Sequence, residues 1–208
     1  MGGSQAPIGV LALQGDVAEH RRMLESLGAP VVEIRQCKDV TGIAGLVIPG
    51  GESTVMDKLT RIFGLYAPLR DLIAQGMPVL GTCAGMIMLA DRLDDAISGQ
   101  QTLGGLDVTV KRNAFGSQKE SFDVALNVDD IDGGPVDVSF IRAPIVTHVG
   151  AGVRVLATLP TGEVVACEGE NILALAFHPE VTGDTRLHER FLDIVAREQF
   201  QADIHCES

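Results

Sequence analysis

The sequence predicts an α/β fold with three layers: a mostly parallel central sheet flanked by helices, with added antiparallel strands in the second half of the chain. Three observations predict this class. Strand-like and helix-like segments alternate through the first half, strand-like segments follow one another through the second half, and one more helical segment comes last. Alternating strands and helices are typical of a parallel sheet that is covered on both faces. The length of 208 residues predicts one domain over 1–208, with an ordered core at about 7–200.

The first half begins with an apolar run at Ile8–Leu13, which predicts a buried strand. Apolar residues then recur at helical spacing through Val17–Leu27, where Asp16 is the expected N-cap and Gly28 the expected stop. The same criteria predict three further strands, at Val31–Ile34, Gly45–Ile48 and Pro78–Leu80. They also predict three further helices, one from Thr54, one over Leu65–Gln75 and one over Ala84–Leu93.

The second half contains short apolar segments separated by Gly, Asp and Pro turns, which favours antiparallel pairing. The predicted strands are Leu106–Lys111, Phe122–Leu126, Val138–Ile141, Val153–Leu159, Glu163–Glu168 and Ile172–Phe177. A last helix is predicted over Leu187–Phe200. No internal repeat or low-complexity linker divides the chain.

Composition excludes several classes of function. The formal net charge is −12 and the pI about 4.7, so an acidic surface would repel phosphate backbones and anionic lipid, and neither a nucleic acid nor a membrane is expected as a partner. The four cysteines show no metal-ligand spacing, and no metal or other cofactor is expected. The first residues lack the features of a signal peptide and no apolar run is long enough to cross a bilayer, so we expect a cytoplasmic protein.

A candidate nucleophile lies at Cys83, within the segment Gly81-Thr82-Cys83-Ala84-Gly85. A predicted strand ends just before this segment and a predicted helix begins within it, which is the pattern of a nucleophile elbow. Such a turn holds the nucleophile in a strained conformation, and the helix N-terminus favours a thiolate. A buried structural cysteine beside two packing glycines would produce the same pattern.

A candidate base follows the predicted strand Ile172–Phe177, in the segment His178-Pro179-Glu180. Side chains two apart on an extended segment point to the same side, so Glu180 could orient His178 while His178 serves as base toward Cys83. Taken alone, the segment could equally be a histidine followed by a surface carboxylate.

Two further motifs indicate binding. In Pro49-Gly50-Gly51-Glu52-Ser53-Thr54, the glycines free backbone amides that could form an oxyanion hole, although a tight turn capped by Ser53 would look the same. Arg112 and Arg142 each end a predicted strand and could hold a substrate carboxylate. Surface arginines paired with local acids are the alternative.

Together these segments resemble class I (triad-type) glutamine amidotransferases and, within them, the glutaminase subunits of pyridoxal 5'-phosphate synthase. The resemblance spans roughly residues 8–200. It is carried by the following segments, which occur in family order: Leu11-Ala12-Leu13-Gln14-Gly15, Pro49-Gly50-Gly51-Glu52-Ser53-Thr54, Gly81-Thr82-Cys83-Ala84-Gly85-Met86, Arg112-Asn113-Ala114-Phe115-Gly116, Phe140-Ile141-Arg142-Ala143-Pro144 and Phe177-His178-Pro179-Glu180. The chain departs from the family pattern at Ser117, Lys119, Glu120 and Val181.

The resemblance implies a glutaminase that hydrolyses L-glutamine to L-glutamate and ammonia through a thioester on the nucleophile. The ammonia would pass to a separate synthase subunit, the expected protein partner, which builds pyridoxal 5'-phosphate. The implied catalytic residues are Cys83, His178 and Glu180. The implied substrate contacts are Gly51, Glu52, Ser53, Arg112, Ile141 and Arg142. The implied oxyanion hole consists of the Gly51 and Ala84 amides, and Gln14 would lie at the face that meets the synthase.

Three other functions fit parts of the pattern. A cysteine hydrolase of the α/β-hydrolase group would place its acid between nucleophile and histidine, whereas here the acid follows the histidine. A glutaminase subunit of another pathway would lack the Arg112–Gly116 and Ile141–Pro144 segments. A binding module without activity would not need the intact triad.

The remaining cysteines and histidines have no evident partner in the sequence. Cys37, Cys167 and Cys206 are therefore expected to be ordinary thiols. His20, His148, His188 and His205 are likewise without an evident partner; His20, on a helix after the Gln14 loop, could face the partner subunit, but a solvated helix position is expected.

Overall fold

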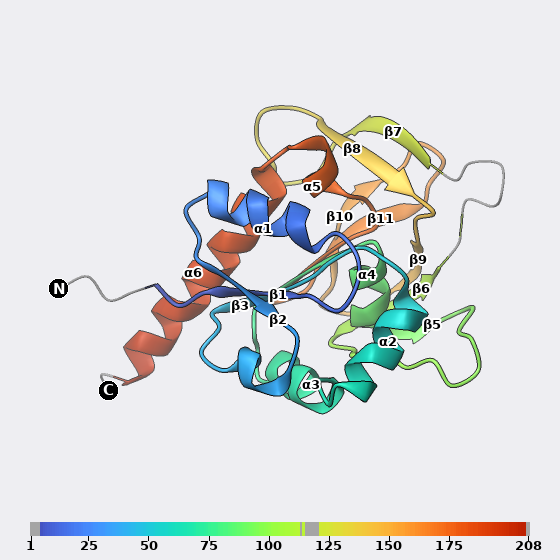
Figure 1. Ribbon diagram of the computed structural model, residues 1–208. Coiled ribbons are helices and arrows are strands. Elements are labelled where there is room, and N and C mark those ends of the chain that lie inside the picture. Colours follow the sequence, from blue (N-terminus) through green and yellow to red (C-terminus); the bar gives the residue numbers. More distant parts are fainter. Residues whose placement is uncertain (1–4, 113, 115–120, 207–208) are drawn as a thin grey trace.

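The computed structural model describes residues 5–112, 114 and 121–206, with side chains as far as residue 200. Several residues named above lie outside this part: Asn113, Phe115 and Gly116 of one motif, and the departures Ser117, Lys119 and Glu120. The predicted class is confirmed, since helices flank a central sheet that is parallel in the first half of the chain and gains antiparallel strands in the second (Figure 1).

Five strands form the parallel part of the sheet, in the order β2-β1-β3-β4-β12. Their bounds are β1 (Ile8–Leu11), β2 (Val31–Ile34), β3 (Gly45–Ile48), β4 (Val79–Thr82) and β12 (Ile172–Leu175). All residues of β1, β3, β4 and β12 are buried, which is typical of parallel strands covered on both faces. The last strand of the chain therefore inserts next to β4.

The second half extends this sheet beyond β12 in the order β11-β9-β6-β5, with β10 paired to β11, and adds a separate hairpin of β7 and β8. The bounds are β5 (Ala90–Leu93), β6 (Leu106–Lys111), β7 (Ser121–Leu126), β8 (Val136–Ile141), β9 (Ile145–Val149), β10 (Arg154–Thr158) and β11 (Val164–Glu168). Most of these pairs are antiparallel, as the turn-rich sequence predicts; β5 and β6 pair in parallel.

Helices cover the parallel strands from two sides (Figure 1). Their bounds are α1 (Val17–Ser26), η1 (Cys37–Val40), α2 (Ser53–Ile62), α3 (Tyr66–Ala74), α4 (Ala84–Leu89), α5 (Pro179–Thr182) and α6 (Arg186–Cys206). In the view of Figure 1, α1 lies above strands β1–β3, and α2 and α3 lie below them. Helix α6 packs Phe191 and Val195 against the glycine that begins β3.

Three local predictions need correction. The segment Ala84–Leu93 is not one helix, because α4 ends at Leu89 and Ala90–Leu93 becomes β5, which pairs with β6. This long-range pairing outweighs a local spacing that favours a helix. Strand β9 and the short helix α5 were absent from the predicted elements. Asp16 occupies the N-cap position of α1, but its side chain accepts no capping hydrogen bond.

Other local predictions are confirmed. Helix α1 stops at Gly28, which has φ +81°, and the amides of Gly28 and Ala29 donate to the carbonyls of Glu25 and Leu24. Buried apolar residues from both halves form one cluster that includes strands β1, β3, β4 and β12 and helix α6. Within the described residues, no helix is both long and apolar enough to cross a bilayer.

Candidate active site

The candidate residues gather where the parallel strands end. Strand β4 leads into Cys83 and its neighbour β12 leads into His178, with Thr82 opposite Leu175 in the register. Strand β3 leads into Gly50 and Gly51, and it lies on the other side of β4. The carboxyl ends of parallel strands are the usual place for a site in an open α/β sheet.

Cys83 has the strained backbone that an elbow requires, with φ +48° and ψ −102°. Its amide donates to the Leu175 carbonyl at 2.7 Å, so the neighbouring strand holds the turn in place. A Cβ on Gly85 would lie 2.1 Å from the Ile48 carbonyl oxygen, and one on Gly81 would lie 2.6 Å from Leu89. Both glycines are therefore required by close packing, and the predicted strand–turn–helix geometry is present.

His178 and Glu180 are in direct contact, with 2.8 Å between His178 Nδ1 and Glu180 Oε1. The predicted contact is present, but the predicted reason for it is wrong. Strand β12 ends at Leu175, His178 is the N-cap residue of α5, and Glu180 lies in the first turn of that helix. Pro179 begins the helix, a position that proline favours because its φ suits the first turn and its missing N–H leaves no donor unpaired.

Burial and hydrogen bonding oppose each other at this pair. Burial disfavours the charged imidazole of His178, but hydrogen bonds to Asp16, Cys83 and Glu180 outweigh it and raise the pKa of His178. Burial also disfavours the carboxylate of Glu180, but the nearby His20 and His178 side chains outweigh it and lower the pKa of Glu180. The contacts therefore favour an imidazolium beside a carboxylate, and Cys83 lines the same cavity as this ring.

Asp16 is a second carboxylate at the same imidazole nitrogen, with 3.3 Å between Asp16 Oδ2 and His178 Nδ1. Its side chain is 38% exposed, whereas that of Glu180 is fully buried. The ring of His178 lies close against Gly50, where a Cβ would be 2.3 Å from His178 Cε1. The position predicted as a helix cap therefore belongs to the surroundings of the base.

A cavity of about 310 Å³ opens over these groups. It is lined by Gln14, Asp16, Gly51, Glu52, Ser53, Cys83, Ile87, Arg112, Ile141, Arg142 and His178. All predicted substrate contacts are in this lining, as is Gln14. The two other predicted residues lie behind it, because Glu180 supports His178 and Ala84 follows Cys83 as the first residue of α4.

The loop before α2 is held by side chains on both sides. Gln14 Oε1 accepts from the Glu52 amide at 2.7 Å. The Glu52 carboxylate caps α2 by accepting from the amides of Thr54 and Val55, at 3.1 and 2.9 Å, and from the Thr54 hydroxyl. These hydrogen bonds lower the pKa of Glu52 against the effect of burial. The cap is thus Glu52, and Ser53, the cap considered from the sequence, is the first residue of the helix.

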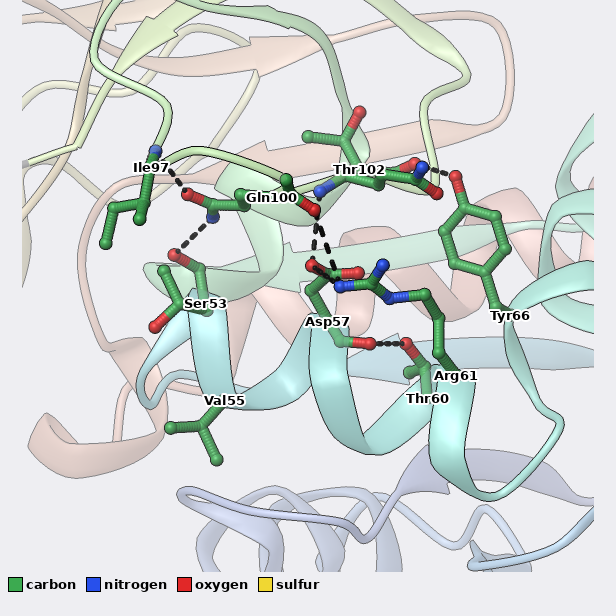
Figure 2. A network of polar contacts seen from close by, with 12 residues as sticks. Ser53, Val55, Asp57, Thr60, Arg61, Tyr66, Ile97, Gln100 and Thr102 are labelled. Atoms are coloured by element: carbon green, nitrogen blue, oxygen red, sulfur yellow. Dashed lines mark hydrogen bonds and ion pairs between the residues drawn. The ribbon is translucent and has the colours of Figure 1, made fainter.

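Ser53 and Arg112 are joined by Gln100, which the sequence did not indicate. Gln100 Nε2 donates to Ser53 Oγ at 3.2 Å, and Gln100 Oε1 accepts from Arg112 Nη1 at 3.0 Å. Figure 2 shows Gln100 in the loop that also holds Ile97 and Thr102, lying over α2. Buried Asp57 of α2 fixes this loop by accepting from the Gln101 amide at 3.2 Å. One wall of the cavity is therefore tied to α2 by polar contacts.

The two arginines differ in their surroundings. Arg112 has a side chain only 11% exposed and lies 3.5 Å from Asp95, so it both lines the cavity and pairs with a local acid. Arg142 has φ +45°, and among the described residues no acidic side chain lies within ion-pair distance of it. The carbonyl of Ile141, the residue before it, lies 3.8 Å from Cys83 Sγ. An unpaired cation that lines the same cavity as the thiol suits a substrate carboxylate.

Two buried histidines behind the triad were missed by the sequence analysis. His20 of α1 is fully buried and lies 3.4 Å from Glu180 Oε1, and His188 of α6 is fully buried and lies 2.9 Å from His20. Their spacing offered a signal, because His20 continues the apolar face of Val17 and Leu24, and His188 precedes Phe191 by one turn.

Asp16, His178 and Glu180 also offer ligand atoms within 4.8 Å of one another, the separation a metal ion would need. Two of the three are already hydrogen-bonded to each other at 2.8 Å. A metal at this place would have to displace the proton that joins them.

Comparisons with known proteins show which family and which relatives the chain is similar to. The model of the SNO glutamine amidotransferase family matches residues 10–197. A protein of Clavibacter michiganensis named pyridoxal 5'-phosphate synthase subunit PdxT is 58% identical over 188 residues, covering 90% of this chain and 90% of that protein. A protein of the same name from Corynebacterium glutamicum (strain ATCC 13032) is 54% identical over 193 residues, covering 91% and 96%.

Solved structures agree in fold. A crystal structure described as glutamine amidotransferase has a TM-score of 0.85 and 42% identity, and the match covers 91% of this chain and 98% of that one. The crystal structure of a putative GMP synthase protein of Thermoplasma acidophilum has a TM-score of 0.71 at 18% identity, covering 97% and 100%, which is a likeness of fold alone.

Proposed function

Because the chain belongs to the SNO glutamine amidotransferase family, we propose that it is a glutaminase, the subunit of pyridoxal 5'-phosphate synthase that hydrolyses L-glutamine to L-glutamate and ammonia. One observation carries this proposal: a strained cysteine and a histidine line the same cavity, and that histidine is hydrogen-bonded to a buried glutamate. The two PdxT relatives described above, which match nine-tenths of the chain, support the choice of pathway.

In the proposed reaction, the Cys83 thiolate attacks the side-chain amide carbon of glutamine. The carbonyl oxygen becomes an oxyanion, for which the backbone amides of Gly51 and Ala84 are the proposed donors. When the C–N bond breaks, the His178 imidazolium gives its proton to the departing nitrogen, which leaves as ammonia. Glu180 holds the ring in position through the 2.8 Å contact.

The thioester on Cys83 is then hydrolysed. Water attacks the thioester carbon, neutral His178 takes its proton, and the C–S bond breaks to release glutamate and restore the thiolate–imidazolium pair. At the other end of the substrate, we propose that Arg112 and Arg142 hold the α-carboxylate, and that the loop of Gly51, Glu52 and Ser53 contacts the rest of the backbone of glutamine.

Ammonia is of use only if it reaches an acceptor, and the synthase subunit supplies that acceptor. We place Gln14 at the face that meets the synthase, because it lines the open cavity and holds the loop before α2. We also assign the protein to the cytoplasm. Free thiols at Cys37, Cys83 and Cys167 support a reducing compartment.

The test is glutamate release by Cys83→Ala in the presence of the synthase subunit. The expected loss is about 10³-fold or more, since nothing else in the triad can form the thioester. Cys37→Ala is the control, because this thiol is exposed and hydrogen-bonded to the Gly64 carbonyl, away from the cavity. A wild-type rate for Cys83→Ala would refute the mechanism, and a rate that the synthase subunit does not change would refute the assignment to this complex.

A further inference from the structure

His20 forms a second polar contact to the glutamate of the triad. It projects from α1 into the protein, where it is fully buried, and His20 Nε2 lies 3.4 Å from Glu180 Oε1 and 3.0 Å from Thr82 Oγ1. Thr82 is the residue before the nucleophile and is also fully buried. His20 therefore contacts both halves of the triad, the glutamate directly and the elbow through its neighbour.

His188 supports His20 from the other side. It belongs to α6, is fully buried, and lies 2.9 Å from His20 Nδ1 through its own Nε2. Burial and the neighbouring His20 lower the pKa of His188 to about 3, so its ring is neutral at physiological pH. Among the described residues, His188 Nδ1 and Glu180 Oε2 have no hydrogen-bond partner. The chain of contacts thus runs from His188 through His20 and Glu180 to His178.

The positions of hydrogens follow from the acceptors. The Glu180 carboxylate only accepts, so a lone pair on His20 Nε2 would face negative charge, whereas an N–H there is attracted to it. A hydrogen on His20 Nε2 also reaches the Thr82 oxygen at 3.0 Å. Neutral His188 can then either donate to His20 Nδ1 or accept from it, so the arrangement holds whether or not His20 carries a charge.

We propose that His20 is a positioning residue that holds the Glu180 carboxylate charged and directed at His178, with His188 fixing the ring of His20. The expected effect on glutamine hydrolysis rests on the proposed function, but the effect on Cys83 reactivity can be measured without that activity. Glu180 uses a single oxygen, Oε1, for both His20 and His178. Loss of His20 should therefore remove one of the two contacts that fix the position of this oxygen relative to His178.

The effect on pH dependence has a defined sign. Glu180 is faced by His20 from α1 and by His178 from the start of α5, while Asp16 and Cys83 face His178 and His188 faces His20. Removing His20 leaves the Glu180 carboxylate with one polar contact fewer, so it is held less firmly toward His178. A carboxylate that is not held against the ring supports the His178 imidazolium less, so the thiolate beside it should form only at higher pH.

The experiment compares His20→Leu with His20→Gln in the full chain. Leu removes both nitrogens, whereas the Gln amide can place an N–H near the position of His20 Nε2. The first readout is the rate of Cys83 alkylation by iodoacetamide in the isolated chain from about pH 5 to 9. It is followed by mass spectrometry of the Cys83 peptide, because the exposed Cys37 reacts with the same reagent. The second is kcat and KM for glutamine with the synthase subunit.

We expect the midpoint of Cys83 alkylation in His20→Leu to rise by about one pH unit, which is the size of a lost charge-assisted contact. We expect kcat to fall about 10- to 100-fold with KM within about threefold of wild type, as for other residues that orient a catalytic side chain. His20→Gln should restore both values most of the way.

Met23→Ala is the matched control, because Met23 is buried on the same face of α1 one turn away from His20. It should lower the melting temperature without moving the alkylation midpoint. An unchanged profile and kcat in His20→Leu would overturn the proposal, and so would an equal shift in Met23→Ala. If His20→Leu shifts the midpoint but wild-type protein hydrolyses no glutamine with the synthase, the proposed function fails and the positioning role stands.

Discussion

Gly50→Ala tests whether the position of the His178 ring limits the proposed reaction. The backbone at Gly50 does not have positive φ, so alanine can adopt it without strain. Its Cβ, however, would lie 2.3 Å from His178 Cε1 and 2.8 Å from Asp16 Oδ2. The substitution therefore acts through contact with the base and its second carboxylate.

The size of the effect follows from the distances. An ordinary contact needs 3.4 Å, so the ring must retreat by about 1.1 Å if the main chain stays in place. His178 is buried and held by Glu180 at 2.8 Å, which leaves little room for compensation. A displacement of about 1 Å at a reacting group costs about 10²-fold in rate, and we expect kcat/KM to fall by this amount.

The assay is glutamate release with the synthase subunit, together with a thermal melt of the isolated chain. Gly169→Ala is the control, because Gly169 also lacks positive φ and its Cβ would meet only the end of Leu106, at 3.0 Å. A folded Gly50→Ala protein with kcat/KM within about threefold of wild type would show that the ring position is not critical.

The other predictions concern the substrate wall and the buried acid. Gln100→Ala should raise KM for glutamine about 5- to 10-fold with kcat unchanged, because it removes one hydrogen bond to Arg112 and one to Ser53. Gln101→Ala is the control in steady-state kinetics, because its backbone amide keeps the hydrogen bond to Asp57. Glu180→Gln should lower kcat about 10²-fold or more, as expected when the residue that orients a base loses its charge. Because folding lowers the pKa of Glu180, its stabilising effect is present above the ordinary glutamate value and lost as pH falls through the folded value. The gap in melting temperature between wild type and Glu180→Gln should therefore shrink below about pH 4.5, and a gap that widens on acidification would contradict the stated sign.

The elbow is the part of the site that local sequence predicted best. Gly81 and Gly85 are spaced for close packing, and the structure shows that a Cβ at either place would collide with its neighbours. The signal is local because strand, turn and helix follow one another in the chain. The same is true of the stop at Gly28, where positive φ favours glycine.

The base and its acid were predicted with the wrong local structure. A proline after a strand can continue an extended segment or begin a helix, and the segment His178-Pro179-Glu180 alone does not distinguish them. The helix α5 forms here with His178 at its N-cap, and the His178 amide donates to the Ser139 carbonyl of β8 at 3.0 Å. Ser139 belongs to the β7–β8 hairpin, far from His178 in the chain, so the residues near His178 carry no sign of this contact.

The buried histidines show a different kind of failure. Polar residues are uncommon on the apolar face of a helix. His20 was therefore predicted to be solvated, because no partner for it was visible in the sequence. Its partners lie on β4, α5 and α6. The apolar face of α1 is consistent with the burial of His20, whereas its polar partners could be identified only from the tertiary structure.

The meeting of Cys83 and His178 depends on register, which neither motif contains. The two residues lie far apart in the chain and come together because β4 and β12 pair in parallel with Thr82 opposite Leu175. A slip of two residues would keep every side chain on its face of the sheet, yet it would carry His178 about 7 Å along the strand direction, out of reach of the thiol. The hydrogen bond from the Cys83 amide to the Leu175 carbonyl, at 2.7 Å, ties the elbow to the correct register. The same bond that shapes the nucleophile therefore also determines where the base arrives.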